Sequence, residues 1–265
     1  MQPLADIPED DLRSVQVLLS DIDDTITTEG RLRAPAYAAL ERLQGSGLRI
    51  VPITGRPAGW CDHIARMWPV DGVVGENGAF YLVYDRERRS MRRFSFVDGE
   101  QLAANRTRLD ALSKKILAEV PGAALASDQP FRLADLAIDF CEDVPSLPRQ
   151  SIERIVALFE AEGAQAKVSS IHVNGWFGDY DKLTMTREFL TRECALDINN
   201  DNRKVLFVGD SPNDEPMFGA FSLSVGVANI RRFADRLLSN PKFVTVASSG
   251  DGFVELAERL LAARK

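Results

Sequence analysis

Residues 17–26 read Val-Leu-Leu-Ser-Asp-Ile-Asp-Asp-Thr-Ile, an apolar run that ends in three aspartates, Asp21, Asp23 and Asp24. The run favours a buried β-strand, because strand interiors favour β-branched and aliphatic side chains. Carboxylates are costly to bury without a partner, so acids at the end of such a strand need a metal or a reacting group. Ligands of open α/β sheets bind at the carboxyl ends of the strands. The segment therefore predicts a chemical site at that edge of a parallel sheet.

The composition narrows the class of protein. The chain has 265 residues, 45% of them hydrophobic, which is enough for one large domain or two unequal ones. A net charge of −7 argues against a nucleic-acid binder held by a general basic field. The three cysteines, Cys61, Cys141 and Cys194, match no metal-ligand spacing and indicate reduced thiols. We find neither a signal peptide nor a membrane-spanning run, and expect a cytoplasmic protein.

The apolar runs alternate with helical stretches, which is typical of a doubly wound parallel sheet. The middle of the chain differs, because hairpin and helix patterns there indicate an α+β insertion. We therefore predict an α/β fold with a Rossmann-like core and an inserted α+β cap domain. The predicted limits are residues 15–80 and 181–265 for the core, 81–180 for the cap, and 1–14 for a loose polar leader.

Asp21 and Asp23 stand two residues apart, beyond the first predicted strand. A carboxylate can attack phosphorus and form an acyl phosphate, which divides one difficult transfer into two easier steps. A second acid is then needed to protonate the leaving oxygen and later to activate water. The pattern predicts attack by Asp21 and proton transfer by Asp23. A helix cap or a turn is the alternative, because aspartates are common at both.

A second acidic loop, Gly209-Asp210-Ser211-Pro212-Asn213-Asp214, follows the apolar run 205–208. Magnesium prefers oxygen ligands, keeps several waters and usually binds only one or two carboxylates directly. We expect Asp21, Asp210 and a backbone carbonyl near Asp23 to hold Mg²⁺, with Asp214 orienting a bound water. The glycine before the acid would let the chain turn sharply at the sheet edge. An Asx-turn explains one such loop, but not two matched loops.

Two further sequence motifs could bind a phosphoryl group. Thr54-Gly55-Arg56 opens a predicted helix, where backbone N–H groups and a hydroxyl favour a phosphate. Lys182, before another helix, would neutralise Asp21 and the charge that develops on the transferred group. Each element alone is equally typical of an ordinary helix start.

Together these motifs resemble those of the haloacid dehalogenase (HAD) superfamily, in the same chain order. The resemblance implies that Asp21 is the nucleophile and Asp23 the general acid/base. It also implies that Thr54 and Lys182 bind the phosphoryl group, and that Asp210 and Asp214 hold Mg²⁺. The predicted cap lies between Asn77 and the lysine, as in subclass IIB. That subclass includes Cof-like, sucrose-phosphate, mannosyl-3-phosphoglycerate and trehalose-phosphate phosphatases and phosphomannomutases. Asp24 stands where many relatives carry glycine, and we expect this difference to have little effect.

Substrate contacts are expected from both domains. Gly55, Arg56 and Asn77 lie near the core motifs. In the cap, His172 and Asn174 share one face if Lys167–Val173 is a strand, because side chains alternate. A half-exposed sheet residue is the alternative that the pattern favours for His172. Arg132 would clamp a second anionic group or lie on the surface.

The function predicted from these residues is Mg²⁺-dependent hydrolysis of a small phosphorylated metabolite, such as a sugar phosphate, through an aspartyl phosphate. A phosphomutase of the phosphomannomutase type would keep the same aspartates and return the phosphoryl group to its substrate. A non-catalytic sugar-phosphate binding protein has no need of Asp23, and neither has a dehalogenase. A signalling receiver is shorter and places its acceptor on a middle strand.

Overall fold

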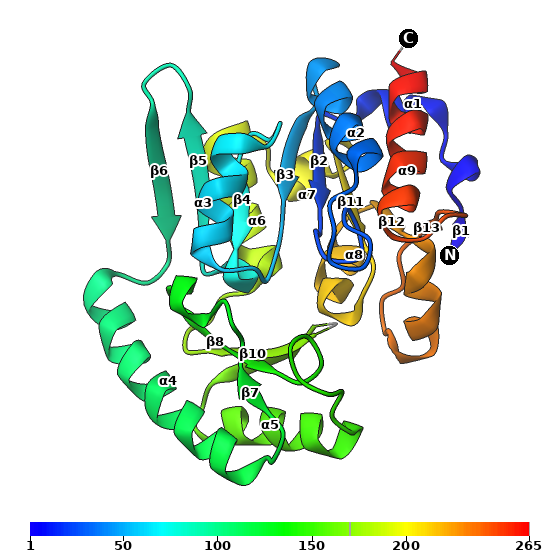
Figure 1. Ribbon diagram of the computed structural model, residues 1–265. Coiled ribbons are helices and arrows are strands. Elements are labelled where there is room, and N and C mark those ends of the chain that lie inside the picture. The colour runs from blue at the N-terminus through cyan, green and yellow to red at the C-terminus, as the bar shows by residue number, and fades with distance from the viewer. Residues whose placement is uncertain (170, 265) are drawn as a thin grey trace.

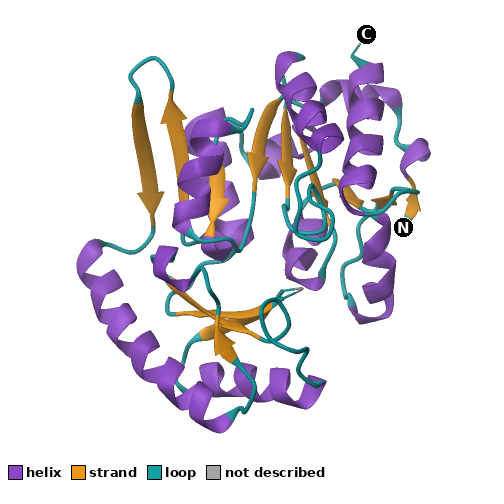
Figure 2. Ribbon diagram, viewed as in Figure 1, coloured by secondary structure: helices purple, strands orange, loops and turns teal. Residues whose placement is uncertain are grey.

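The computed structural model describes residues 1–169 and 171–264 (Figures 1 and 2). Its core is a parallel sheet of six strands in the order β1-β13-β12-β11-β2-β3, which confirms the predicted α/β core. The strands are β1 (Gln2–Pro3), β2 (Val17–Ser20), β3 (Arg49–Pro52), β11 (Val205–Gly209), β12 (Leu223–Gly226) and β13 (Phe243–Val244).

Both faces of this sheet are covered by helices, which explains why its strands are apolar throughout. Along β2, Leu18 belongs to one hydrophobic cluster, and Val17 and Leu19 belong to the other. This is the alternation expected of a strand buried on both sides. Helices α1 (Glu9–Ser14), α2 (Ala34–Gly45), α3 (Ala58–Met67) and α9 (Ser249–Ala263) contribute to the first cluster, and α6 (Lys182–Cys194), α7 (Ile198–Asp201) and α8 (Glu215–Ala220) to the second.

A short antiparallel sheet of β4 (Val73–Gly75), β5 (Phe80–Asp85) and β6 (Ser90–Ser95) continues the core beyond β3. A single parallel bridge, Ile53 to Val74, joins the two sheets. The hairpin expected near residues 80–96 is therefore present, but Tyr81 and Leu82 pack in the core clusters. We accordingly propose that the inserted domain begins after this hairpin, later than the expected residue 81.

The cap is an antiparallel sheet in the order β7-β8-β10-β9, backed by two helices (Figure 1). Helices α4 and α5 share one hydrophobic cluster with β8 and β10, so the opposite face of the sheet is turned to the core (Figure 1). The elements are α4 (Gly99–Glu119), β7 (Ala124–Leu125), β8 (Asp135–Asp139), α5 (Arg149–Ala161), β9 (Gln165–Val168) and β10 (His172–Trp176).

Two local predictions differ from the structure. The expected strand Lys167–Val173 is the turn region of a hairpin, because β9 ends at Val168 and β10 begins at His172; Ser170 in that segment lies outside the described residues. The expected loose leader over residues 1–14 is ordered instead. Strand β1 pairs with β13, and Leu4 and Leu12 are buried in the core. Within the described part of the chain, every helix is too short or too polar to cross a membrane.

Candidate active site

The two acidic loops meet at one edge of the core sheet. Strands β2 and β11 are parallel neighbours with Ser20 opposite Val208, so Asp21 and Asp210 leave the sheet side by side. Carboxylate oxygens of Asp21, Asp210 and Asp214 lie within 4.8 Å of one another, and all three residues are buried. The structure thus brings together the residues that the sequence placed at a metal site.

Lys182 supplies positive charge to this cluster. It is the first residue of α6, and its Nζ lies 2.7 Å from Asp21 Oδ1 and 2.8 Å from Asp214 Oδ1. Burial raises the pKa of Asp21 to about 8 although the ammonium of Lys182 opposes this effect. One lysine therefore does not balance the cluster.

A divalent cation fits these donors. The pKa of Asp210 is raised well above its usual range by burial, and then by the charges of Asp21 and Asp214. Three buried carboxylates facing one ammonium leave uncompensated negative charge, which is costly in the interior. An all-oxygen donor set is the kind that Mg²⁺ prefers. The three carboxylates therefore fit a metal cation.

Asp214 has both carboxylate oxygens engaged by the protein. Its Oδ1 contacts Lys182, and its Oδ2 accepts hydrogen bonds from the backbone N–H groups of Asp210 at 3.1 Å and Ser211 at 3.4 Å. A Cβ at Gly209 would lie 2.4 Å from Asp214 Oδ2. Gly209 is therefore needed for this close approach, a different reason from the sharp turn expected from the sequence.

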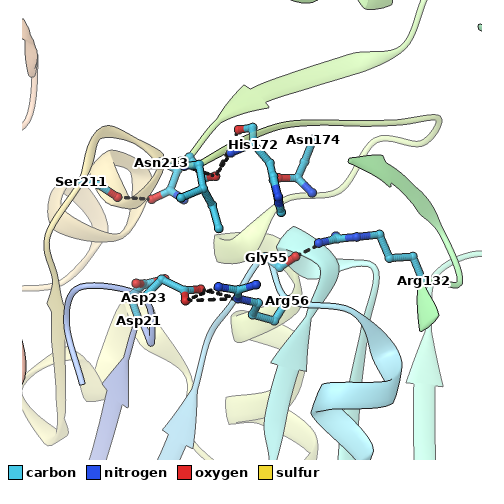
Figure 3. A pocket seen from close by; sticks show the side chains of 11 residues that line it. Asp21, Asp23, Gly55, Arg56, Arg132, His172, Asn174, Ser211 and Asn213 are labelled. Carbon is cyan, nitrogen blue, oxygen red and sulfur yellow. Dashed lines mark hydrogen bonds and ion pairs between the residues drawn. The ribbon is translucent and has the colours of Figure 1, made fainter. Parts of the chain in front are cut away.

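Asp23 points toward Arg56 (Figure 3). Arg56 Nε donates to both oxygens of Asp23 at 3.1 Å, and Nη2 donates to Oδ1 at 3.0 Å. Among the described residues, the side chain of Asp23 is not part of the cluster. A contribution from this residue to the metal would come from its backbone carbonyl, as the sequence suggested.

The loop after β3 holds three predicted residues, of which Gly55 and Arg56 line the same cavity as Asp23. Thr54 is fully buried, and its Oγ1 accepts a hydrogen bond from the backbone N–H of Arg56 at 3.0 Å. Gly55 lies against Asn77, so a Cβ there would come within 3.1 Å of Asn77 Oδ1. Asn77 has a φ of 54°, and its backbone N–H donates to the Thr54 carbonyl. Gly55 therefore lines the cavity, whereas Thr54 and Asn77 hold the backbone of this loop and are not among the described residues that line it.

The cavity lies between core and cap (Figure 3). Asp21, Asp23, Gly55 and Arg56 line it from the core, and His172 and Asn174 line it from β10. His172 and Asn174 therefore share one face, as expected. His172 is only 2% exposed, so the half-exposed alternative favoured for it is wrong.

Arg132 also reaches the cavity, but cap acids already pair its guanidinium. Its Nε donates to Asp128 at 2.9 Å, and its Nη1 donates to Asp135 at 3.0 Å and to the Gly55 carbonyl at 2.9 Å. Asn174 Nδ2 donates to the same Asp135 at 2.9 Å. The side chain of Arg132 is buried, which excludes a surface position, and its pairing leaves little positive charge for a substrate anion.

Sequence reasoning missed Glu142, which connects the cap to Arg56. Glu142 Oε1 accepts hydrogen bonds from Nη1 and Nη2 of Arg56 at 3.3 Å, and its Oε2 lies 2.8 Å from His172 Nε2. The hydrogen bond to His172 lowers the pKa of Glu142 to about 2, and the charge of Arg56 contributes. Glu142 follows a cap strand, whereas the sequence motifs were sought after core strands.

Asn229 was missed as well, although the sequence carried a signal for it. This residue follows β12, and its Nδ2 donates to Asp210 Oδ2 at 2.7 Å and to the Asp24 carbonyl at 3.1 Å. A polar residue just beyond a core strand lies at the same sheet edge as the aspartates. The rule that located Asp21 and Asp210 would therefore have located Asn229.

Comparisons with known proteins agree with this geometry. No family model matches the chain. A phosphoglycolate phosphatase of Methanobrevibacter smithii is 23% identical over 258 residues, which cover 94% of this chain and 99% of that protein. Among solved structures, a HAD-superfamily phosphatase of Bacteroides thetaiotaomicron has a TM-score of 0.61 at 18% identity, covering 93% of this chain and 95% of that one. The sucrose-phosphatase of Synechocystis, solved with sucrose and phosphate, has a TM-score of 0.64 at 17% identity, with coverage of 94% and 98%.

These likenesses confirm the resemblance that the motifs indicated, at the level of the fold. The chain has a HAD-like α/β fold, with a parallel six-stranded core sheet and a separate antiparallel sheet that forms a cap.

Proposed function

We propose that this chain, which has the fold of the HAD superfamily, is a Mg²⁺-dependent phosphatase for a small phosphorylated metabolite. The observation that carries the proposal is the position of Asp21. Its carboxylate is buried at the sheet edge, in contact with Lys182 and within 4.8 Å of Asp210 and Asp214. The distant relationship to phosphoglycolate phosphatases supports the same activity.

Magnesium would be held by Asp21 and Asp210, with Asp214 and the backbone carbonyl of Asp23 completing the site. When bound, it would draw negative charge from the phosphoryl oxygens. Lys182 adds a fixed positive charge beside Asp21. A preorganised cation of this kind stabilises charge that develops in the transition state.

In the first step, a carboxylate oxygen of Asp21 attacks phosphorus and forms the P–O bond of an aspartyl phosphate. The bond from phosphorus to the ester oxygen breaks, and Asp23 gives its proton to that oxygen, so the product leaves as an alcohol. Arg56 holds Asp23 toward the cavity with hydrogen bonds of 3.0 and 3.1 Å. Cap residues above the cavity exclude bulk water during this step.

In the second step, Asp23 is a carboxylate and accepts a proton from a water molecule. The oxygen of that water attacks phosphorus, the P–O bond to Asp21 breaks, and inorganic phosphate is released. Asp21 returns as a carboxylate and Asp23 as an acid, so protons and charge balance over the cycle. A non-catalytic binding protein would need neither proton transfer.

The substrate is proposed to be a small phosphate ester, either a phosphorylated acid such as phosphoglycolate or a sugar phosphate. The relatives favour the first class and the sucrose-phosphatase fold favours the second. Release of inorganic phosphate should be measured with Mg²⁺ across both classes. A phosphomutase would instead yield an isomerised sugar phosphate with little free phosphate. No phosphate release from any of these esters would refute hydrolysis.

A further inference from the structure

We infer that Arg56 and His172 form a binding site for a carboxylate of the substrate, and that Glu142 occupies this site until the substrate displaces it. Arg56 and His172 would then favour phosphorylated hydroxy acids over neutral esters, and Glu142 would be a specificity-determining residue that competes with the carboxylate of the substrate. The inference rests on the proposed phosphatase function and adds a device that selects the substrate.

Glu142 already shows how a carboxylate binds between these two side chains. One of its oxygens accepts hydrogen bonds from Arg56 and the other lies 2.8 Å from His172 Nε2. Arg56 and His172 line the central cavity, whereas Glu142 lines the neighbouring one. The carboxylate therefore reaches this pair of residues from outside the cavity that would hold the substrate.

Glu142 is the replaceable member of this group. Its side chain is 30% exposed, against 7% for Arg56 and 3% for His172. Arg56 is held in place without it, because Arg56 bonds Asp23 at 3.0 Å and lies over the ring of Trp60 at 4.5 Å. The contacts from Arg56 to Glu142 are longer, at 3.3 Å. A free carboxylate in the cavity could therefore take this place without dismantling the site.

A second acid near Arg56 does not play this part. Asp128 Oδ2 lies 3.7 Å from Arg56 Nη1, but both Asp128 oxygens accept shorter hydrogen bonds from Arg132, at 2.9 and 3.1 Å. Asp128 is also buried. It therefore stays where it is when a ligand enters.

The position of Arg56 sets the distance between the two ends of the substrate. The same guanidinium contacts Asp23, the proposed proton donor to the ester oxygen, and Glu142. A carboxylate that replaces Glu142 must consequently lie close to that ester oxygen. A phosphorylated hydroxy acid with one or two carbons between the two groups meets this requirement, whereas a neutral sugar offers nothing to displace Glu142.

The test compares Glu142→Gln with the parent on phosphoglycolate and on phenyl phosphate, which has no carboxylate. An ion pair at a partly exposed site contributes about 1 kcal/mol or less, so removal of the competing carboxylate should lower the KM for phosphoglycolate by up to about fivefold. The ratio of kcat/KM values should move toward phosphoglycolate. His172→Gln should move the ratio in the opposite direction. Asp143→Asn, a change at an exposed neighbouring acid, should leave the ratio unchanged.

Two results separate this inference from the proposed function. If the parent hydrolyses phosphoglycolate but the KM of Glu142→Gln is unchanged or higher, Glu142 is a positioning residue for Arg56 and the inference fails alone. If the parent hydrolyses neither ester, the function fails, and calorimetric binding of glycolate decides the inference. Tighter binding of glycolate to Glu142→Gln than to the parent would support it, and equal or weaker binding would refute it.

Discussion

Asp24 occupies a backbone conformation that favours glycine. Its φ is 56°, and side chains in this left-handed region are strained, although aspartate tolerates it better than most residues. Burial and the adjacent charge of Asp23 also raise the pKa of Asp24. The sequence predicted little effect because the residue was expected to face solvent; the structure gives it a cost.

We therefore predict that Asp24→Gly stabilises the protein by about 0.5–1 kcal/mol, because it relieves both the backbone strain and the charge repulsion. Urea unfolding at pH 7 measures the change. Asp24→Asn is the control, since it removes the charge and keeps a side chain. A glycine variant less stable than the asparagine variant would show that the conformation is not strained.

Glu142, which forms an ion pair with Arg56 and contacts His172, gives a pH dependence of known sign. The pKa of Glu142 is lowered from 4.5 to about 2, so the folded protein holds this proton less tightly than the unfolded chain. The stabilisation is therefore present above about pH 4.5 and is lost as the pH falls toward 2.

Glu142→Gln should consequently be less stable than the parent at pH 7, by about 1 kcal/mol or less because the group is partly exposed. The difference should shrink between pH 5 and pH 3, as measured by urea unfolding. Asp143→Asn serves as the matched control. A difference that stays constant over this range would contradict the ion pair.

The acidic residues proposed for the site could be predicted from the sequence because they follow apolar runs that identify core strands. Asp21 and Asp210 were located in this way. The partners of Arg56 and Arg132 could not be predicted, because the acids that pair with them come from the cap or from turns within it. Nothing in the sequence indicates that Glu142 lies beside Arg56, 86 positions away along the chain.

At the scale of elements, Glu76 joins the core to the cap. This fully buried residue follows β4 and has a φ of 44°. Its Oε1 accepts hydrogen bonds from the N–H groups of Ala58 at 2.9 Å and Leu133 at 2.8 Å, and its Oε2 from Ala134 at 2.6 Å and Asp135 at 3.2 Å. One carboxylate thus accepts hydrogen bonds from the backbone N–H groups at the start of α3 and in the segment that leads into β8.

Glu76→Gln places an N–H₂ group against backbone N–H donors and leaves at least one of them unpaired. We predict a loss of about 3 kcal/mol of unfolding free energy, the scale for hydrogen bonds to a charged group. Hydrogen exchange should accelerate at Leu133, Ala134 and Asp135.

Glu255→Gln is the control for this variant. Glu255 accepts backbone hydrogen bonds from Val246 and Ala247, in the core and away from the cap. It should leave exchange at residues 133–135 unchanged. Unaltered exchange there in Glu76→Gln as well would mean that Glu76 does not hold the cap segment.

The elements themselves were predicted best where periodicity was strong. The core strands and α9 were located well, whereas β9 and β10 were merged into one strand because no glycine or proline in the sequence separates them. Strand β1 was missed because it has only two residues. Its pairing with β13, at the far end of the chain, leaves no local signal.

For the whole molecule, we predict that the carboxylate cluster makes the free energy of unfolding depend on metal. Mg²⁺ that binds the folded chain alone should stabilise it by about 2.7 kcal/mol at a concentration a hundredfold above its Kd. Asp210→Asn removes one of three buried charges. Without metal this variant should be more stable than the parent, and with saturating Mg²⁺ it should be less stable.

Thermal unfolding with EDTA and with MgCl₂ tests this reversal. Asp110→Asn, at an exposed position on α4, is the control and should follow the parent in both buffers. If Mg²⁺ leaves the thermal unfolding midpoint of the parent unchanged, the proposed metal site is contradicted.

The two-domain architecture was predictable because the order of the motifs along the chain fixes where an insertion can occur. The face that the cap turns to the core was not, because it depends on contacts such as Arg132 to the Gly55 carbonyl. These contacts join segments that show no common pattern in the sequence. The substrate-binding side of the site is therefore the part that needed the structure.

The most direct test of the central claim is to trap the phosphoryl group on Asp21. The parent should be mixed with phosphoglycolate and Mg²⁺, quenched in acid during turnover, reduced with borohydride and digested for mass spectrometry. An aspartyl phosphate is reduced to homoserine, and we predict homoserine at position 21 in the parent and none in Asp21→Asn, which should also release no phosphate. Steady release of phosphate with position 21 unmodified would contradict the account.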